Sequence, residues 1–437
     1  MRRLTMVELN EFNRELLEQA AAQMDVPSIG RVLELRRTST RTDDVYQDGS
    51  LEPWVQWVSI HTGVPYGAHG VLHIGDLPDE GLPQIWETLS DRGVSSGVWG
   101  VLNGARRRAD NCHFFVPDPW TFHERAHPES LHGLIALPRF LAKNRLHVVQ
   151  GRLLRHGARL ALAFANPRRL VGAMQQLPTI LKMATRDPAR AYVYFSAFEY
   201  LAAKRFAEMK RRHDPSFSVL FLNLLAHAQH YYWSPLDLSN NARMRYVLKY
   251  VDLALAEVFS ALRDDEQLVV LNGFEQVNIA HDEPHHVYRQ RDHLRFLRER
   301  LDVTPVSVDA HMTNDAHLIF ETEGELERAV AALSSARVNG EPLFELQRYA
   351  EHRTKLFFRV CYGRPLPPNS DYQIEGRTFR FWDDFESLGT HTGRHAPSGT
   401  VYSTLPDIPD RVANHEVLKT ISAYFGVPSW PVVPPAA

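Results

Sequence analysis

The sequence predicts an α/β fold in which a mostly parallel central sheet carries helices on both faces. Short, continuously apolar segments alternate along the chain with longer segments of helical periodicity, which is the pattern of strand–helix–strand units. Strands of a parallel sheet are covered on both faces, so they read as unbroken apolar runs. The composition agrees with a globular protein, because 44% of the 437 residues are hydrophobic and 23% are charged.

The predicted elements follow in order from the N-terminus. Residues 4–9 (LTMVEL) predict a buried strand, and residues 12–24 have the apolar spacing of a helix. Further strands are expected at 96–102, 112–120, 217–226 and 267–271, and further helices at 82–93, 206–215 and 251–265. Ligands of such sheets bind at the carboxyl ends of the strands, so functional residues are expected directly after these strands.

One interruption of this alternation is residues 139–212, which we expect to be helical. The segment holds 16 Lys and Arg against three Asp and Glu, a local charge of +13 in a chain whose total charge is −3. Two interpretations stay open: a solvated helical insertion, or a lid over an anionic ligand. Aromatic residues are not interleaved with these cations, so no nucleic-acid partner is expected.

The second interruption is residues 303–375, which predict a small α+β insertion. A strand is expected at 316–322 and a helix at 324–336, followed by a turn and a further apolar stretch. The α/β core is therefore expected at 1–302 and 376–437, ending in a proline-rich tail.

Several classes of protein are excluded by composition. No apolar run reaches the length of about 18 residues that a membrane helix needs, and the N-terminal segment lacks the apolar core of a signal peptide. We therefore expect a cytoplasmic protein without a transmembrane segment. Two cysteines form no disulfide framework, whereas 22 histidines direct attention to metal or proton-transfer chemistry. A homo-oligomer is neither indicated nor excluded.

An ordered set of motifs resembles a known family. The helix and loop at 54–70 contain Trp57, Thr62-Gly63 and His69-Gly70. Four further motifs follow along the chain: PDPW at 117–120, His-Tyr-Tyr-Trp at 230–233, Gly-Phe at 273–274 and GRHAPSG at 393–399. In this order and spacing they resemble the alkaline phosphatase superfamily, and its type I phosphodiesterase/nucleotide pyrophosphatase branch in particular. The resemblance implies the α/β core of the alkaline phosphatase superfamily, with a mostly parallel sheet, and a metal-dependent phosphoester hydrolase or transferase.

The sequence departs from that family where its chemistry resides. Asn10 stands at the position of the first metal-binding Asp, Pro53 at the position of the nucleophile, and Ala226 at that of a second Asp. Leu271-Asn272 replaces the Asp-His of a further motif, so only His230 and His395 match expected ligands. Proline has no side-chain nucleophile, so the family's usual two-metal mechanism does not carry over.

A rebuilt site is expected where polar residues gather at the strand ends. These residues are Glu8, Asn10, Glu11, Glu52, His227, His230, Asn272, Glu275, Gln276, His281 and His395. We assign catalytic roles to Glu8, Asn10, Glu52 and His230, and substrate binding to Asn272, Gln276 and Arg394. A glutamate with two or three histidines holds one divalent ion, Zn or Mn, for which the predicted histidine ligands are His230, His395 and His281. A metal-free route stays open, with Glu52 or Glu8 acting beside His230 or His61.

Two functions follow from these observations. The first is a divergent hydrolase or transferase that acts on a phosphorylated or other anionic small molecule or glycoconjugate, with one metal ion or none. The alternative is a ligand-binding protein that kept the fold and lost the chemistry, because fold alone does not fix function.

Overall fold

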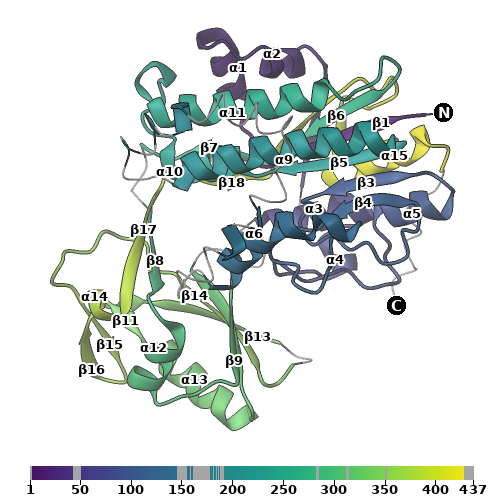
Figure 1. Cartoon of the computed structure of the whole chain (residues 1–437). Helices are drawn as coiled ribbons and strands as arrows, with labels where there is room; N and C mark the ends of the chain where they lie inside the picture. The colour runs from purple at the N-terminus through teal and green to yellow at the C-terminus, as the bar shows by residue number, and fades with distance from the viewer. Residues whose placement is uncertain are drawn as a thin grey trace. The chain divides into compact units, whose positions relative to one another are not determined.

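The computed structural model describes residues 2–42, 51–144, 191–281, 285–311, 314–349 and 352–427, and between 144 and 191 only 155–157, 159–160, 178–180, 182–183, 185 and 187. The chain forms two compact units, and Figure 1 labels many of their elements. The first comprises Met1–Arg139, Leu153–Asn278 and Gly393–Ala437, and the second comprises Phe140–Arg152 and Ile279–Thr392.

The first unit is built on an eight-stranded sheet. Its strands are β1 (Leu4–Leu9), β2 (Arg36–Arg41), β3 (Ser96–Trp99), β4 (Cys112–Val116), β5 (Phe217–Leu222), β6 (Gln267–Leu271), β19 (Ser398–Ser403) and β20 (Arg411–Ala413), in the spatial order β20-β2-β19-β6-β1-β5-β3-β4. Strand β1 pairs in parallel with both β5 and β6, whereas β19 runs antiparallel to β6 and β2. The sheet is mostly parallel, as the sequence predicts.

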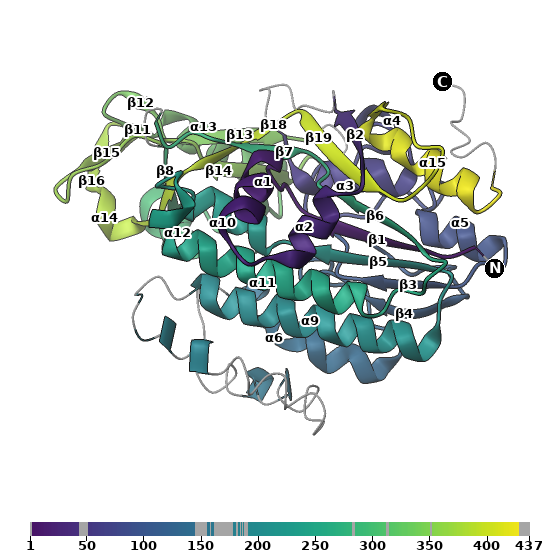
Figure 2. The same ribbon diagram turned by 90° about the horizontal axis from the view of Figure 1, so that it is seen from above.

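Helices cover both faces of this sheet. One face carries α1 (Arg14–Gln23), α2 (Pro27–Leu33), α9 (Ala191–His213), α10 (Leu224–Tyr232) and α11 (Ala242–Phe259). The other carries α3 (Pro53–Thr62), α4 (Tyr66–His69), α5 (Ile85–Asp91) and α15 (Val417–Tyr424). Figure 2 shows α11 and α9 running along the strands, with α3, α5 and α15 beyond them. The predicted α/β class is therefore confirmed.

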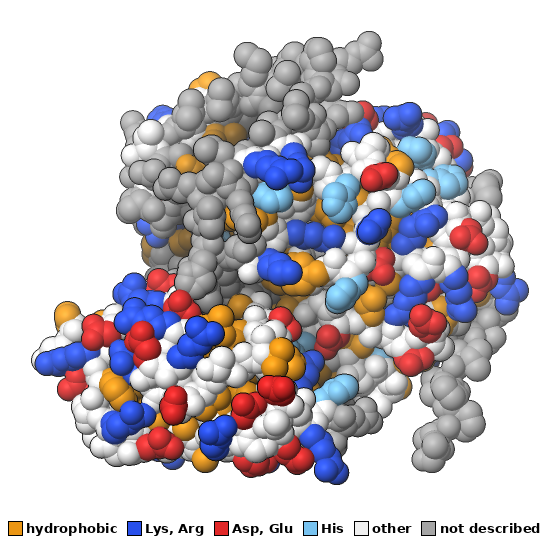
Figure 3. All heavy atoms as spheres, turned by 60° about the horizontal axis from the view of Figure 1, so that its bottom comes forward, with side chains coloured by type: hydrophobic (Ala, Val, Ile, Leu, Met, Phe, Trp, Pro, Cys, Tyr) orange, Lys and Arg blue, Asp and Glu red, His pale blue; other side chains and the backbone are white. Residues whose placement is uncertain are grey.

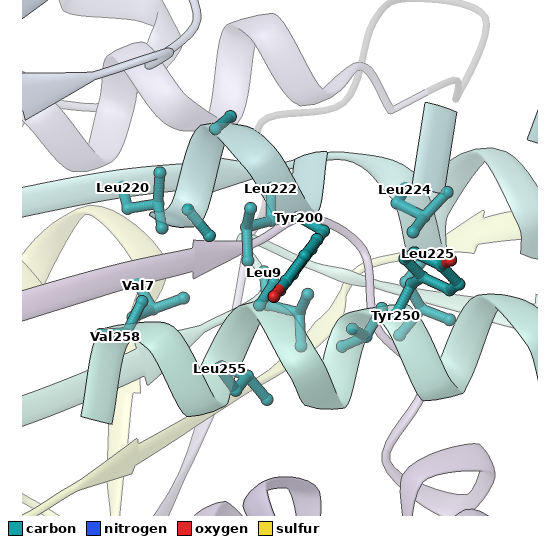
Figure 4. Packing of buried hydrophobic residues seen from close by; sticks show 14 of the residues in the cluster. Val7, Leu9, Tyr200, Leu220, Leu222, Leu224, Leu225, Tyr250, Leu255 and Val258 are labelled. Carbon is teal, nitrogen blue, oxygen red and sulfur yellow. The ribbon is translucent and has the colours of Figure 1, made fainter. Parts of the chain in front are cut away.

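The largest hydrophobic core lies between the sheet and helices α9 and α11. Val7 and Leu9 of β1 pack there with Tyr200 of α9 and Leu255 of α11, as Figure 4 shows. Burying an aliphatic side chain of this size stabilises the fold by about 1.5–3 kcal/mol. Because side chains of a strand alternate, the residue between Val7 and Leu9, Glu8, points to the opposite face, where α3 lies.

The second unit has its own core and two four-stranded sheets. One sheet has the order β13-β14-β10-β9 and the other β12-β11-β15-β16. Their strands are β9 (Ser307–Ala310), β10 (Asp315–Ile319), β11 (Arg337–Val338), β12 (Glu341–Pro342), β13 (Phe344–Arg348), β14 (Lys355–Val360), β15 (Asp371–Ile374) and β16 (Arg377–Arg380); β8 (His285–Gln290) pairs with β17 (Phe385–His391), and the helices are α12 (His293–Leu301), α13 (Glu323–Ser335) and α14 (Phe381–Asp384).

The predicted insertion at 303–375 lies inside this second unit, whose limits are wider. Tyr288, Phe296 and Phe381 lie outside 303–375 and share one buried cluster with Leu318 and Phe358 inside it. The flanking strands and helix therefore belong to the same unit by their packing.

The basic segment 139–212 is divided by the structure. Its last part forms α9, in which Tyr192 and Phe206 are fully buried in the core of the first unit, so these residues are core rather than insertion. Residues 145–154 and 161–177 lie outside the described residues, and the predicted lid falls mainly on them. Among the described helices, none is long and apolar enough to cross a membrane.

The surface shown in Figure 3 has a mixed charge. Basic, acidic and histidine side chains are interspersed on this face rather than separated into regions of one sign. This distribution fits a chain whose formal net charge is only −3.

Candidate metal centre

The candidate site is in the first unit, at the carboxyl end of β1. Asn10 and Glu11 follow the strand, and Glu11 has a φ of 57°, in the left-handed region that few residues other than glycine adopt. The Glu11 N–H donates to the Asn272 carbonyl at 2.9 Å, and the Glu11 carbonyl accepts the Gln276 N–H at 3.2 Å. These bonds fix a turn that determines where the Glu11 carboxylate points.

Two histidines from distant parts of the sequence meet this carboxylate. His230 lies in the last turn of α10, and His395 lies in β18 (Gly393–Ala396), which pairs with β7 (Glu275–Asn278). His395 Nε2 is 3.1 Å from Glu11 Oε2 and 3.2 Å from His230 Nε2, and His230 Nε2 is 3.2 Å from Glu11 Oε2. One oxygen and two nitrogens thus form a nearly equilateral triangle.

This triangle has the dimensions of a metal site. Ligands at about 2.0–2.1 Å from a tetrahedral zinc ion are about 3.3–3.4 Å apart, close to the separations here. Two histidines and a carboxylate are also a donor set that leaves further positions for water or substrate. Among the described residues, Glu11, His230 and His395 are the one group of His, Cys, Asp and Glu whose ligand atoms converge in this way. We call these three residues the Glu-His-His cluster.

A second layer of hydrogen bonds orients the cluster. Asn10 Nδ2 donates to Glu11 Oε1 at 2.9 Å, and Gln276 Nε2 donates to Glu11 Oε2. The Nδ1–H of His395 donates to the Leu51 carbonyl, which leaves Nε2 as the nitrogen that faces Glu11. These hydrogen bonds orient Glu11 and His395 so that their ligand atoms face each other.

Asn10 is itself held by two neighbours. Its Nδ2 also donates to Asn223 Oδ1 at 2.8 Å, and its Oδ1 accepts the indole N–H of Trp57 at 2.7 Å. Trp57 is one of the residues of the family-like helix at 54–70, so that helix contributes to the site through Asn10. With its polar atoms used in this way, Asn10 is a positioning residue.

Glycine at position 393 lets two elements approach each other closely. A Cβ there would overlap Gln276 Oε1 and lie 2.8 Å from the Gln229 carbonyl. Gln229 and His230 are neighbours on α10, and Gly393 begins the strand that carries His395. A side chain at 393 would therefore push the two histidines apart.

Strong electrostatic coupling marks the cluster. Burial raises the pKa of Glu11, but the charge of His395 and hydrogen bonds from His230 and His395 outweigh burial and hold the pKa well below its usual range. Burial lowers the pKa of His395, but the charge of Glu11 and its hydrogen bond, with the charge of Glu52, raise it to about 9. Burial also lowers the pKa of nearby His227 to about 4, so that ring is neutral.

The structure places two of the predicted site residues in the interior. Glu8 is fully buried and its Oε1 lies 2.7 Å from His61 Nε2, so it forms a core pair with α3 rather than joining the cluster. Asn272 is also buried; its Nδ2 donates to the Phe12 carbonyl and its Oδ1 accepts the Thr400 N–H. Glu8 thus links β1 to α3, and Asn272 links the backbone at Phe12 to the backbone at Thr400.

The remaining predicted residues lie in different positions. Glu52 precedes α3 and is close enough for its charge to raise the pKa of His395. Gln276 is buried against Glu11. Arg394 is exposed and, as the neighbour of His395 on a strand, points to the opposite face. His281 is exposed in the second unit and belongs to no cluster of ligands among the described residues.

The His-Gly of the helix and loop at 54–70 has a structural role. His69 Nδ1 accepts the Val71 N–H at 3.0 Å, so its Nε2 carries the proton and donates to Ser59 Oγ at 3.0 Å. An imidazole that donates to a hydroxyl does not take its proton, so this Ser-His pair is not a nucleophile and base. Burial lowers the pKa of His69 to about 4, in keeping with a neutral ring.

No family model matches the sequence, and no curated protein matches it. Comparison of the fold finds solved structures over nearly the whole chain. Human ectonucleotide pyrophosphatase/phosphodiesterase 5 is 10% identical, with 98% of this chain and 96% of that chain covered and a TM-score of 0.48. Phosphonoacetate hydrolase from Sinorhizobium meliloti 1021 is 14% identical, with 98% and 95% covered and a TM-score of 0.43. These two solved structures are proteins to which the chain is similar along nearly its whole length.

Proposed function

We propose that this protein is a hydrolase of phosphorylated or other anionic small molecules that uses one divalent metal ion, held by Glu11 Oε2, His230 Nε2 and His395 Nε2. The observation that carries the proposal is the triangle of these atoms, with sides of 3.1–3.2 Å. A carboxylate and two imidazoles leave part of the coordination sphere open, as in catalytic sites. Zinc and manganese are the ions proposed.

The charge of the loaded site favours an anionic substrate. Glu11 contributes one negative charge and the two imidazoles are neutral when they act as ligands, so a divalent ion leaves the site with positive charge. Bound there, the ion would supply Lewis-acid polarisation of a phosphoryl oxygen and a water molecule ionised near neutral pH.

The protein's own residues would hold and complete the site. Asn10 and Gln276 fix the two oxygens of Glu11, and the Leu51 carbonyl fixes the ring of His395. Glu52, whose charge reaches His395, is the proposed proton acceptor for the attacking water. This mechanism needs no side-chain nucleophile, in agreement with Pro53 at the family's nucleophile position.

The first test is the metal content of protein purified without a histidine tag. We expect about one equivalent of zinc or manganese in the wild type, and loss of that metal in Glu11→Gln and His395→Ala. His123→Ala is the matched control, because His123 is exposed and outside the cluster. Elemental analysis by mass spectrometry gives the content, and circular dichroism confirms that each variant is folded.

Turnover is tested on the metal-loaded protein. The substrates are aryl phosphate monoesters and diesters, aryl sulfates, AMP and phosphonoacetate, the last two because similar structures are described with AMP and with phosphonoacetate. Hydrolysis that disappears in Glu11→Gln and persists in His123→Ala supports the proposal. A folded protein that takes up no metal contradicts it. Metal binding with ligand-induced thermal stabilisation but no turnover would replace it by the binding-protein alternative.

A further inference from the structure

Four polar side chains of the second unit form a group separate from the Glu-His-His cluster. His311 follows β9, Asp315 and His317 belong to β10, and Tyr349 follows β13. His317 is paired with Phe357 of β14, which lies between β10 and β13 in the sheet. Figure 1 labels β9, β13 and β14 in the second unit.

The four side chains are joined end to end by hydrogen bonds. Asp315 Oδ2 is 3.0 Å from His311 Nδ1, His311 Nε2 is 2.9 Å from His317 Nδ1, and His317 Nε2 is 2.7 Å from Tyr349 Oη. Asp315, His311 and His317 are all buried, whereas Tyr349 is only half-buried. The chain therefore leads from a buried carboxylate to a phenol at its more exposed end.

The direction of every proton in this chain follows from the carboxylate. With Asp315 ionised and both imidazoles neutral, His311 donates from Nδ1 to Asp315 and accepts at Nε2. His317 must then donate from Nδ1 and accept at Nε2, so the Tyr349 hydroxyl donates to His317. Each group polarises the next, and the phenol proton is drawn toward the interior.

The neighbours of Tyr349 reinforce this polarisation. Lys355 Nζ lies 5.1 Å from the centre of the Tyr349 ring, so its positive charge favours the phenolate. The rings of Phe357 and His317 are in contact, with their centres 5.7 Å apart. The imidazole that accepts the phenol proton is thus held against an apolar ring.

We propose that Tyr349 is the nucleophile of a second reactive site, activated by the Asp315–His311–His317 chain. The ligands are electrophilic sulfonyl, acyl or phosphoryl compounds with a good leaving group, and Lys355 favours those that carry a negative charge. Tyr349 is the nucleophile, His317 is the base that takes its proton, and Asp315 is the orienting carboxylate. His311 is an additional imidazole between the base and the carboxylate. This site is independent of the metal centre and of the function proposed for it.

The reaction with an arylsulfonyl fluoride balances as follows. A bond forms between Tyr349 Oη and sulfur, and the sulfur–fluorine bond breaks, releasing fluoride. The phenol proton passes to His317 Nε2, and the Asp315 carboxylate, acting through His311, stabilises the imidazolium that forms. No oxidant or reductant takes part.

The test is labelling of the full-length protein with 4-(fluorosulfonyl)benzoate, followed by peptide mass spectrometry. We expect Tyr349 to be labelled faster than Tyr194, an exposed tyrosine on α9 that serves as the internal reference. His317→Gln should slow labelling of Tyr349 by about 100-fold and leave Tyr194 unchanged, because glutamine cannot take up a proton. Asp315→Asn should slow it as well, since the carboxylate charge is lost.

Two further measurements decide between reactivity and a structural role. The cationic reagent 4-(2-aminoethyl)benzenesulfonyl fluoride should label Tyr349 more slowly than the anionic one, and Lys355→Met should remove that difference. Thermal melting of each variant shows whether it is folded. Equal labelling of Tyr349 and Tyr194 in the wild type overturns the proposal, as does an unchanged rate in folded His317→Gln.

Discussion

At the scale of single residues, the backbone conformation of Glu11 determines which side chain at the end of β1 faces His230 and His395. Asn10 and Glu11 are adjacent, yet Asn10 supports and Glu11 faces the histidines. His230, His395 and Asn10 could be singled out from the sequence because each occupies a motif position. Glu11 was expected only to lie near them, because the direction of its side chain depends on a φ of 57° that no local pattern signals.

Removal of the Asn10 amide tests this division of roles. In Asn10→Ala the Glu11 Oε1 atom loses its donor, so Gln276, which donates to Oε2, alone holds the carboxylate from behind. We expect metal affinity to fall by about 10–100-fold, the usual effect of losing a second-layer partner. Competition with a chelator of known affinity measures it.

Asn240→Ala is the control for this change, because Asn240 is exposed and its amide caps a surface turn. Equal affinity in the two variants would mean that Asn10 does not position Glu11.

The buried pair of Glu8 and His61 has a different expected effect. In His61→Leu the Glu8 carboxylate stays fully buried without its partner, so the free energy of unfolding should fall by about 3–5 kcal/mol. Metal content should be kept, because neither residue belongs to the cluster. Urea unfolding and elemental analysis give the two values. An unchanged stability together with lost turnover would instead place the pair in the chemistry.

At the scale of elements, α10 is the helix that brings His230 to β1. The backbone N–H groups of Asn223, which precedes α10, and of Leu224, its first residue, donate to the Glu199 carboxylate of α9 at 2.7 and 3.0 Å. The sequence predicts β1, β5 and β6 well, because buried parallel strands are continuous apolar runs. It does not predict that α9 belongs to the core, because the prediction for 139–212 rests on the net charge of the whole segment. A net charge does not reveal that one face of a helix, here the face with Tyr192 and Phe206, is apolar and buried.

Glu199 gives α10 a pH-dependent support. Burial raises the pKa of Glu199 from 4.5 to about 7, although two backbone N–H groups favour the charged form. A raised pKa in the folded state means that the stabilisation is complete below the unfolded pKa and is lost as pH rises toward 7. Chemical unfolding of the wild type should therefore show stability declining from about pH 4.5 to 7 more steeply than in Glu199→Gln. Parallel curves for the two proteins would contradict this assignment.

At the scale of the whole molecule, the two units have separate hydrophobic cores. Phe296 packs with Phe344, Tyr372 and Phe385 in the second unit, whereas the metal cluster belongs to the first. The sequence predicts an insertion at 303–375, and the second unit also includes β8 and β17, which pair across 94 or more intervening residues. Such long-range pairing has no local signal.

Separate cores predict separable unfolding. Phe296→Ala should destabilise the second unit by about 3–5 kcal/mol and leave the metal content unchanged. Hydrogen exchange measured by mass spectrometry should show faster exchange within 285–391 only. The reciprocal control is Leu255→Ala, which truncates a core side chain of α11 and should raise exchange in the first unit. Faster exchange throughout the chain in Phe296→Ala would mean that the molecule unfolds as one cooperative body.

The segment 279–392 leaves and re-enters the first unit at two neighbouring residues. The chain leaves the first unit after Asn278 and returns at Gly393, and these two residues are direct partners in the β7–β18 ladder. A tight two-residue turn is enough to join neighbouring antiparallel strands. Residues 279–392, which form the second unit together with residues 140–152, therefore begin and end at one point of the first unit. A chain shortened by this segment would still have both strands that carry Gln276 and His395, joined as an ordinary hairpin.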